Sequence, residues 1–110
     1  MPPERLGLVQ GTVDVLILKT LTWSPMHGYG ISQWIRQRTD GALAVEDAAL
    51  YQALHRLERK GWVDSEWGVS DTNRRAKFYS ITRDGRKQLQ NDIIALRRYV
   101  EALFKVIQPA

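Results

Sequence analysis

The sequence predicts a mainly α fold of the α+β class: a winged helix-turn-helix of three helices plus a two-stranded β-hairpin wing, followed by one long C-terminal helix. Three observations predict it. Apolar residues recur at helical spacing in three segments of the first sixty residues, two short aromatic and β-branched runs follow, and an apolar heptad stripe occupies the end of the chain. We therefore expect residues 1–82 to form the winged helix-turn-helix and residues 83–110 the long helix.

The first two helices are short and are separated by a proline. We expect the first over Thr12–Leu21, with Thr12 as its N-cap, and it should end before Pro25 because proline lacks the N–H that continues a helix. The second is expected over Gly28–Arg38. The glycine at position 28 weakens its first turn by about 1 kcal/mol relative to alanine, which predicts close packing against a neighbouring helix.

The third helix is the best defined, running from Glu46 or Asp47 to Lys60, with Gly61 as its stop. On a helical wheel one side carries only the apolar residues Leu50, Ala53, Leu54 and Leu57. The other side is polar, with Tyr51 at its border, and carries Gln52, His55, Arg56 and Arg59. Such groups can donate to phosphates and to base edges in a major groove, although a solvated helix face can have the same composition.

A basic hairpin follows the third helix. We expect strands over Trp62–Trp67 and Ala76–Ile81, joined by a loop rich in turn residues. The segment from Arg74 to Lys87 contains six cations and one anion, a net charge of +5, whereas the whole chain carries +4. An arginine pair in a loop is usually only solvated. Next to a polar helix face, the side chains Arg74, Arg75 and Lys77 are instead typical of a wing that contacts DNA.

The last helix should begin after the cap Thr82 and extend to about Ile107. Its apolar residues are spaced 4, 3, 4, 3, 4 and are Leu89, Ile93, Leu96, Val100, Leu103 and Ile107. A 3.5-residue repeat indicates a partner helix, although the stripe could also dock on the chain's own body. We favour a homodimer because so small a chain gains most by pairing with a second copy.

Composition excludes several other classes of protein. The 110 residues contain no cysteine, which excludes disulfides, thiol catalysis and Cys-based metal sites. No apolar run is long enough to span a membrane, and Met1–Arg5 does not begin a secretory signal, so we expect a cytoplasmic protein. His55 and Glu58 are close in sequence but lack a third metal ligand, and no catalytic constellation is present, so no enzyme, metal or cofactor is predicted. Most of the four tryptophans are expected in the core, although one or two could line a ligand pocket near a dimer interface.

Several motifs occur in one order from Gly11 to about Leu89: Pro25–Ile31 (PMHGYGI), Leu50–Arg59, Gly61–Val63, Asn73–Tyr79, Ile81-Thr82 and Gly85-Arg86. As a set they are specific, and with them the chain resembles a short member of the PadR family of bacterial transcriptional regulators. The resemblance implies a homodimeric DNA-binding protein, most simply a repressor acting on a pseudo-palindromic operator.

The same resemblance implies which residues bind DNA. The helix matching Asp47–Lys60 would enter the major groove, the hairpin matching Trp62–Ile81 would be the wing, and residues 83–110 would pair with a second copy. The implied DNA contacts are Tyr51, His55 and Arg56 in the helix and Arg74, Arg75 and Lys77 in the wing. The polar side of the helix adds Gln52 and Arg59 to the expected contacts. Some relatives bind small aromatic effectors at the dimer interface. The last helix has Tyr99 and Phe104 but no tryptophan, which leaves an effector site open.

Two positions depart from the family pattern. Ala49 stands where members usually have Ser or Thr, and Gln52 stands where they have Pro. The first change removes a hydroxyl, and the second adds an amide that could read adenine, so a different operator is expected. The alternative function is a winged-helix protein-interaction or effector-sensing module without DNA binding. Such a module should have an apolar or acidic outer helix face and a neutral hairpin, and the sequence has neither.

Overall fold

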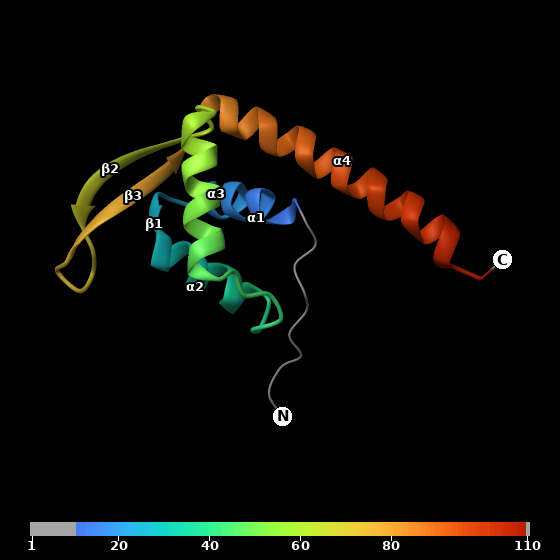
Figure 1. Cartoon of the computed structure of the whole chain (residues 1–110), viewed down its shortest axis with the longest axis horizontal. Coiled ribbons are helices and arrows are strands. Elements are labelled where there is room, and N and C mark those ends of the chain that lie inside the picture. The colour runs from blue at the N-terminus through green and yellow to red at the C-terminus, as the bar shows by residue number, and fades with distance from the viewer. Residues whose placement is uncertain (1–10, 110) are drawn as a thin grey trace.

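The computed structural model describes residues 11–109, so the expectation about a secretory signal at Met1–Arg5 falls outside it. Four helices and three strands follow one another in the order α1 (Thr12–Leu21), β1 (Met26–His27), α2 (Gly28–Arg38), α3 (Asp47–Arg59), β2 (Val63–Val69), β3 (Arg75–Ile81) and α4 (Arg83–Ile107). The wing extends to one side of the three-helix body and α4 extends to the other (Figure 1). The predicted fold class is confirmed.

One hydrophobic core joins α1, α2 and α3. Ile17 and Leu18 of α1 and Ile31 of α2 are fully buried in it. The apolar side of α3 completes the core, because all four residues predicted for its stripe, Leu50, Ala53, Leu54 and Leu57, are buried. The helical spacing of the sequence therefore identified the buried face of α3 correctly.

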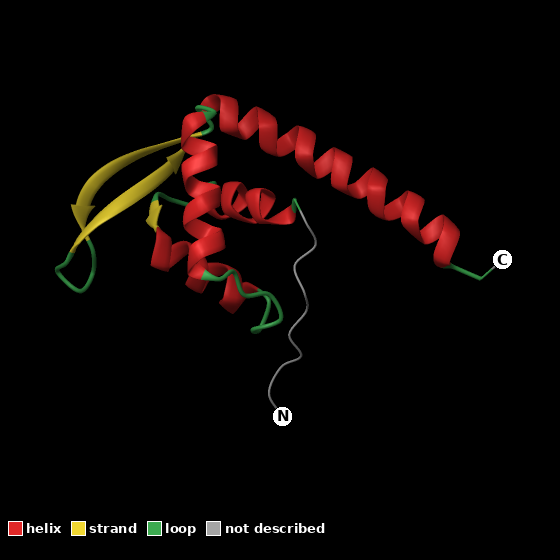
Figure 2. Ribbon diagram, viewed as in Figure 1, coloured by secondary structure: helices red, strands yellow, loops and turns green. Residues whose placement is uncertain are grey.

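The sheet has three strands rather than the two that the sequence predicted. Its order is β1-β3-β2, all antiparallel (Figure 2). The additional strand, Met26–His27, pairs with Tyr79 and Phe78 of β3. A two-residue strand cannot show an alternating pattern, which is why the sequence did not reveal it. It ties the start of α2 to the base of the wing.

The helix caps agree with the sequence at one of the two predicted positions. Thr82 caps α4, since its hydroxyl accepts a hydrogen bond from the Gly85 N–H at 3.0 Å. The prediction for α1 was wrong, because Thr12 is the first helical residue and the N-cap is Gly11. Gly11 has a φ of 89°, a conformation that glycine adopts without strain.

The prediction that most tryptophans lie in the core was also wrong. Trp23 and Trp67 are 61% and 59% exposed, and the other two are only partly buried. Three of the four rings instead lie under cations: Arg38 over Trp34 at 5.7 Å, Lys60 over Trp62 at 4.7 Å and Arg75 over Trp67 at 4.6 Å. Trp62 also packs partly against the core, and each cation gives its ring a favourable contact that does not require burial.

The long helix α4 starts from a tight joint with the body. The Thr82 N–H donates to the Trp62 carbonyl at 3.0 Å, and the Thr82 hydroxyl donates to the Gly61 carbonyl at 2.7 Å. A Cβ atom on Gly85 would lie 2.1 Å from the Trp62 carbonyl oxygen, so only glycine fits there. The joint therefore sets the direction in which α4 leaves the body. Within residues 11–109, neither α4 nor any other helix combines the length and apolarity required to cross a membrane.

We expect Gly85→Ala to destabilise the protein by about 1–3 kcal/mol, because the new methyl group would overlap a backbone carbonyl that cannot move aside by rotating a side chain. Thermal or urea unfolding followed by circular dichroism measures the change. Gly30→Ala is the matched control, since its Cβ would meet the His27 ring at an ordinary 3.4 Å and alanine favours a helix. Equal stability of the two variants would contradict the tight joint.

Candidate nucleic-acid interface

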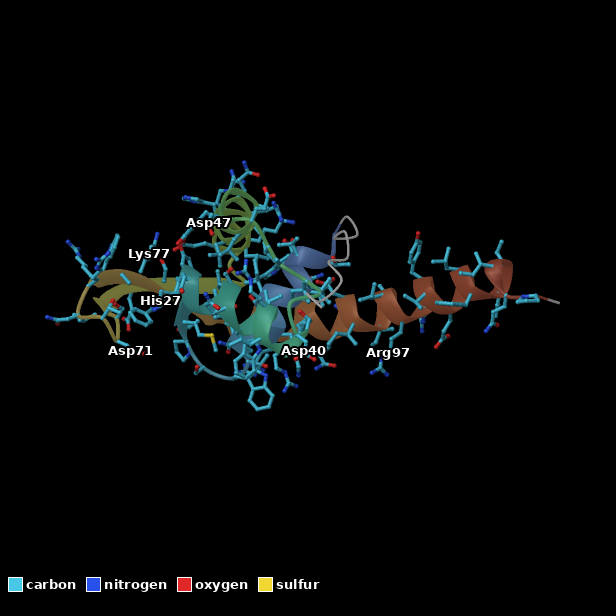
Figure 3. The ribbon with its side chains drawn as sticks, turned by 90° about the horizontal axis from the view of Figure 1, so that it is seen from below. His27, Asp40, Asp47, Asp71, Lys77 and Arg97 are labelled. Atoms are coloured by element: carbon cyan, nitrogen blue, oxygen red, sulfur yellow. The ribbon has the colours of Figure 1, made fainter. Side chains whose placement is uncertain are left out.

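The polar side of α3 faces solvent next to the wing. Gln52, His55 and Arg59 are exposed, and Tyr51 is 47% exposed. Figure 3 shows α3, with Asp47 at its beginning, standing out from the body beside the wing that carries Lys77. The DNA contacts predicted on α3 are therefore accessible on one side of the helix, and the apolar residues on its other side anchor it in the core.

Tyr51 is wedged against the first residue of α2. A Cβ atom on Gly28 would lie 2.6 Å from the Tyr51 hydroxyl oxygen. This contact confirms the close packing that the sequence predicted for Gly28, and it identifies Tyr51 as the neighbour. The phenol is therefore held at the border between α2, α3 and the wing.

Arg56 is oriented by an ion pair that the sequence did not predict. One terminal guanidinium nitrogen lies 2.5 Å from the Asp14 carboxylate of α1. The Arg56 side chain remains 41% exposed, and a guanidinium has five N–H donors, so the pair leaves other donors accessible. Residues 42 positions apart carry no local sequence signal for such a contact.

The tip of the wing is an ordered turn with two arginines at its end. The Ser70 N–H donates to the Arg74 carbonyl at 2.8 Å, and Asn73 adopts a φ of 59°, which asparagine tolerates better than most residues. Arg74 and Arg75 are both exposed. Arg75 lies over the Trp67 ring, so this arginine has a fixed support while its charge stays at the surface.

The third DNA contact predicted on the wing, Lys77, is less exposed than Arg74 and Arg75 and has an ion-pair partner. Its ammonium nitrogen lies 3.6 Å from a carboxylate oxygen of Glu58 in α3 and 5.8 Å from the centre of the Tyr79 ring. The second carboxylate oxygen of Glu58 accepts a hydrogen bond from the Ser65 hydroxyl. Burial, followed by the nearby Glu58 and Tyr51, raises the pKa of Tyr79, so its phenol remains protonated.

A cleft of about 1110 Å³ separates the wing from the beginning of α2. Its walls are formed by Pro25–Gly30, Gln33 and Tyr51 on one side and by wing residues from Trp67 to Tyr79 on the other. Tyr29, which the sequence did not single out, lines this cleft, is 68% exposed and accepts a hydrogen bond from Gln33 at 2.8 Å. Its sequence signal was its place in the first turn of the expected second helix, within the motif Pro25–Ile31.

The stripe of α4 divides into a buried and an exposed part. Leu89 is 2% exposed and belongs to the chain's own core, and Ile93 packs partly against that core. Leu96 is half-buried, whereas Val100, Leu103 and Ile107 are 40%, 42% and 58% exposed. A second groove of about 650 Å³ runs between α1 and α4, with Val15, Leu96 and Tyr99 among its lining residues. The exposed half of the stripe therefore begins beside this groove.

No metal site is assembled from the described residues, because no three of their His, Asp and Glu side chains gather closely enough. His55 is exposed, and Glu58 is occupied by Ser65 and Lys77.

Known proteins resemble this chain over most of its length. Residues 17–91 match the transcriptional regulator PadR-like family. An uncharacterized protein of Lysinibacillus sphaericus is 36% identical over 86 residues, which cover 77% of this chain and 78% of that protein.

Solved structures agree with the family match. A transcriptional regulator from Clostridium thermocellum superposes with a TM-score of 0.83 at 31% identity, covering 90% of this chain and 96% of the other. A PadR family transcription regulator from Clostridium difficile gives a TM-score of 0.73 at 25% identity, covering 90% and 100%. The matched residues begin within α1 and include α2, α3, the whole wing and the first turns of α4. The chain therefore belongs to the PadR-like family of transcriptional regulators and is a DNA-binding regulator rather than an enzyme.

Proposed function

We propose that this regulator is a homodimeric repressor that binds a pseudo-palindromic operator and thereby blocks transcription in the cytoplasm. The observation that carries the proposal is the placement of the polar side of α3 and the basic wing on one side of the body. A major groove admits one α-helix, and phosphates lie on both sides of it. A helix and a wing presented together can therefore contact base edges and backbone at once.

In this proposal the exposed side chains of α3 read the bases. The Gln52 amide can bond an adenine edge through two hydrogen bonds, and the guanidinium of Arg59 or Arg56 can do so with guanine. His55 lies between them on the same exposed side. Gly28 supports Tyr51 from behind, which favours a fixed position for its phenol against the duplex.

The wing and the cleft are proposed to hold the phosphate backbone. Arg74 and Arg75 are exposed cations at the wing tip, and Tyr29 adds a hydroxyl from the opposite wall of the cleft. Contacts of this kind orient a protein on DNA without reading its sequence. They should supply most of the salt-dependent affinity.

The exposed half of the α4 stripe is proposed to pair with a second copy. Val100, Leu103 and Ile107 follow one another along α4, and the groove between α1 and α4 lies next to them. Two recognition helices joined in this way should lie about 34 Å apart, one turn of DNA, or a multiple of it. Whether the dimer also binds a small aromatic effector depends on Tyr99 and Phe104, which are exposed on α4.

Specific binding is tested with labelled DNA from upstream of the protein's own gene and with random duplex of equal length. Fluorescence anisotropy should show tighter binding to the upstream DNA. Gln52→Ala should weaken that binding by about 1–3 kcal/mol and leave the affinity for random duplex unchanged, because the amide contacts bases only.

Gln37→Ala, at the exposed end of α2, is the matched control and should change neither affinity. Equal losses on both duplexes would remove Gln52 from base reading. Equal affinity of the unmodified protein for both duplexes would overturn control of its own gene.

Replacing Arg74 and Arg75 with alanine should weaken binding to both duplexes. The slope of log affinity against log salt concentration should become shallower by about one unit for each phosphate that the variant no longer neutralises. The matched control is Arg97→Ala with Arg98→Ala, which removes the same charge from exposed positions of α4. Figure 3 shows Arg97 pointing away from α3. An unchanged slope in the wing variant would remove the wing from the mechanism.

Leu103→Glu should convert the dimer into monomers, because it places a charge in the middle of the exposed stripe. Sedimentation velocity at tens of micromolar protein measures the change in mass. The control is Ile94→Glu, since Ile94 is similarly exposed at 49% but lies on the opposite side of α4. Unmodified protein that sediments as a monomer would overturn the dimer.

A further inference from the structure

We propose that Glu58 is a positioning residue that restrains Lys77 and holds the wing against α3, so that it lowers affinity for DNA of any sequence and raises discrimination for the operator. The inference rests on the proposed function, because it assumes that α3 and the wing contact the same duplex. It concerns a side chain that the sequence suggested only as a poor metal ligand.

One carboxylate connects three elements. Glu58 lies near the end of α3, Ser65 on β2 and Lys77 on β3. Ser65 is paired with Tyr79 in the hairpin, which makes Lys77 its diagonal neighbour on the same side of the sheet. The two carboxylate oxygens take one partner each, the Ser65 hydroxyl and the Lys77 ammonium. Each strand of the wing is thus attached separately to α3.

Among the side chains of α3, all of which are described, Glu58 is the one with a hydrogen bond or ion pair to the hairpin. Arg56 pairs with α1, and Val63 and Tyr79 of the wing belong to the same hydrophobic core as the apolar side of α3. Apolar contacts are not directional, whereas the hydrogen bond from Ser65 and the ion pair with Lys77 favour one placement of each strand relative to the carboxylate. Glu58 therefore restrains the orientation of the wing.

The charge of Glu58 has the wrong sign for a surface that approaches DNA. An unpaired carboxylate there would repel phosphates, and Lys77 neutralises it. The pairing has a reciprocal effect, because Lys77 lies between Glu58 and the Tyr79 ring and would have to give up both contacts to reach a phosphate. The side chains of Lys77 and Glu58 are 34% and 32% exposed, so solvent screens the pair only in part.

These two effects have opposite consequences for the two kinds of DNA. Releasing Lys77 adds a phosphate contact that is available on any sequence. Releasing the wing removes the alignment that lets the bases and the backbone of one operator be contacted together. Loss of Glu58 should therefore favour random DNA over the operator.

The first test is Glu58→Gln, which keeps an oxygen that can accept from Ser65 and removes the charge that holds Lys77. Binding to random duplex should become about fivefold tighter at 0.15 M salt, and its salt slope should steepen by about one unit. The ratio of the affinity for the upstream DNA to the affinity for random duplex should fall. Anisotropy titrations at several salt concentrations measure all three quantities.

The matched control is Glu66→Gln. Glu66 is exposed on the opposite side of β2, and the variant has the same net charge as Glu58→Gln. A general effect of charge would appear in both variants, whereas the release of Lys77 appears only at position 58. In a Lys77→Met background, Glu58→Gln should no longer steepen the salt slope.

A second measurement tests the restraint itself. Glu58→Ala also removes the partner of Ser65, and it should speed hydrogen exchange at the amides of β2 and β3 relative to Glu66→Ala. If the protein binds DNA but Glu58→Gln and Glu66→Gln have the same affinities for both duplexes, the proposed role of Glu58 is overturned and the proposed function is not. Unmodified protein that binds no duplex at all overturns the proposed function instead.

Discussion

Burial of one side of α3 is the constraint on which the rest of the structure depends. Leu50, Leu54 and Leu57 are at most 1% exposed, so the helix has one rotational setting in the body. That setting decides which side chains remain outside. Base-reading residues on a helix that could roll would point in several directions, and no fixed set of base edges could match them.

Contacts at the edges of the buried side of α3 connect the helix to three neighbouring elements. Asp14 connects α3 to α1, Gly28 lets the Tyr51 ring pack on α2, and Glu58 connects α3 to the wing. The core fixes the rotation of α3, and these three contacts fix the positions of α1, α2 and the wing relative to it.

The sequence predicted the parts of the fold that are encoded locally. Periodicity located the four helices and the apolar side of α3, and turn residues located the hairpin.

The sequence-based prediction failed where residues far apart in the chain decide the outcome. The strand Met26–His27 exists only because β3 offers it a partner, and the Arg56–Asp14 pair joins positions 42 residues apart. The placement of the tryptophans failed for a different reason, since residue type alone suggested burial, whereas Trp23 and Trp67 are mostly exposed and three of the four rings contact cations. The residues of the candidate site were chosen correctly as to exposure for Gln52, His55, Arg59, Arg74 and Arg75, but nothing in the pattern indicated that Glu58 restrains Lys77.

The close approach of Gly85 to the Trp62 carbonyl matters for the far end of α4, because a small rotation at the base of a long helix produces a large displacement at its other end. A helix of 25 residues is about 37 Å long, so a rotation of about 6° at its base moves its far end by about 4 Å. That displacement already exceeds the rise of one base pair, about 3.4 Å. A dimer assembled through the far end of α4 would therefore lose its register on DNA if the base were loose. Because Gly85 has no side chain, the start of α4 can pack directly against the Trp62 carbonyl, and this contact favours one angle between α4 and the body.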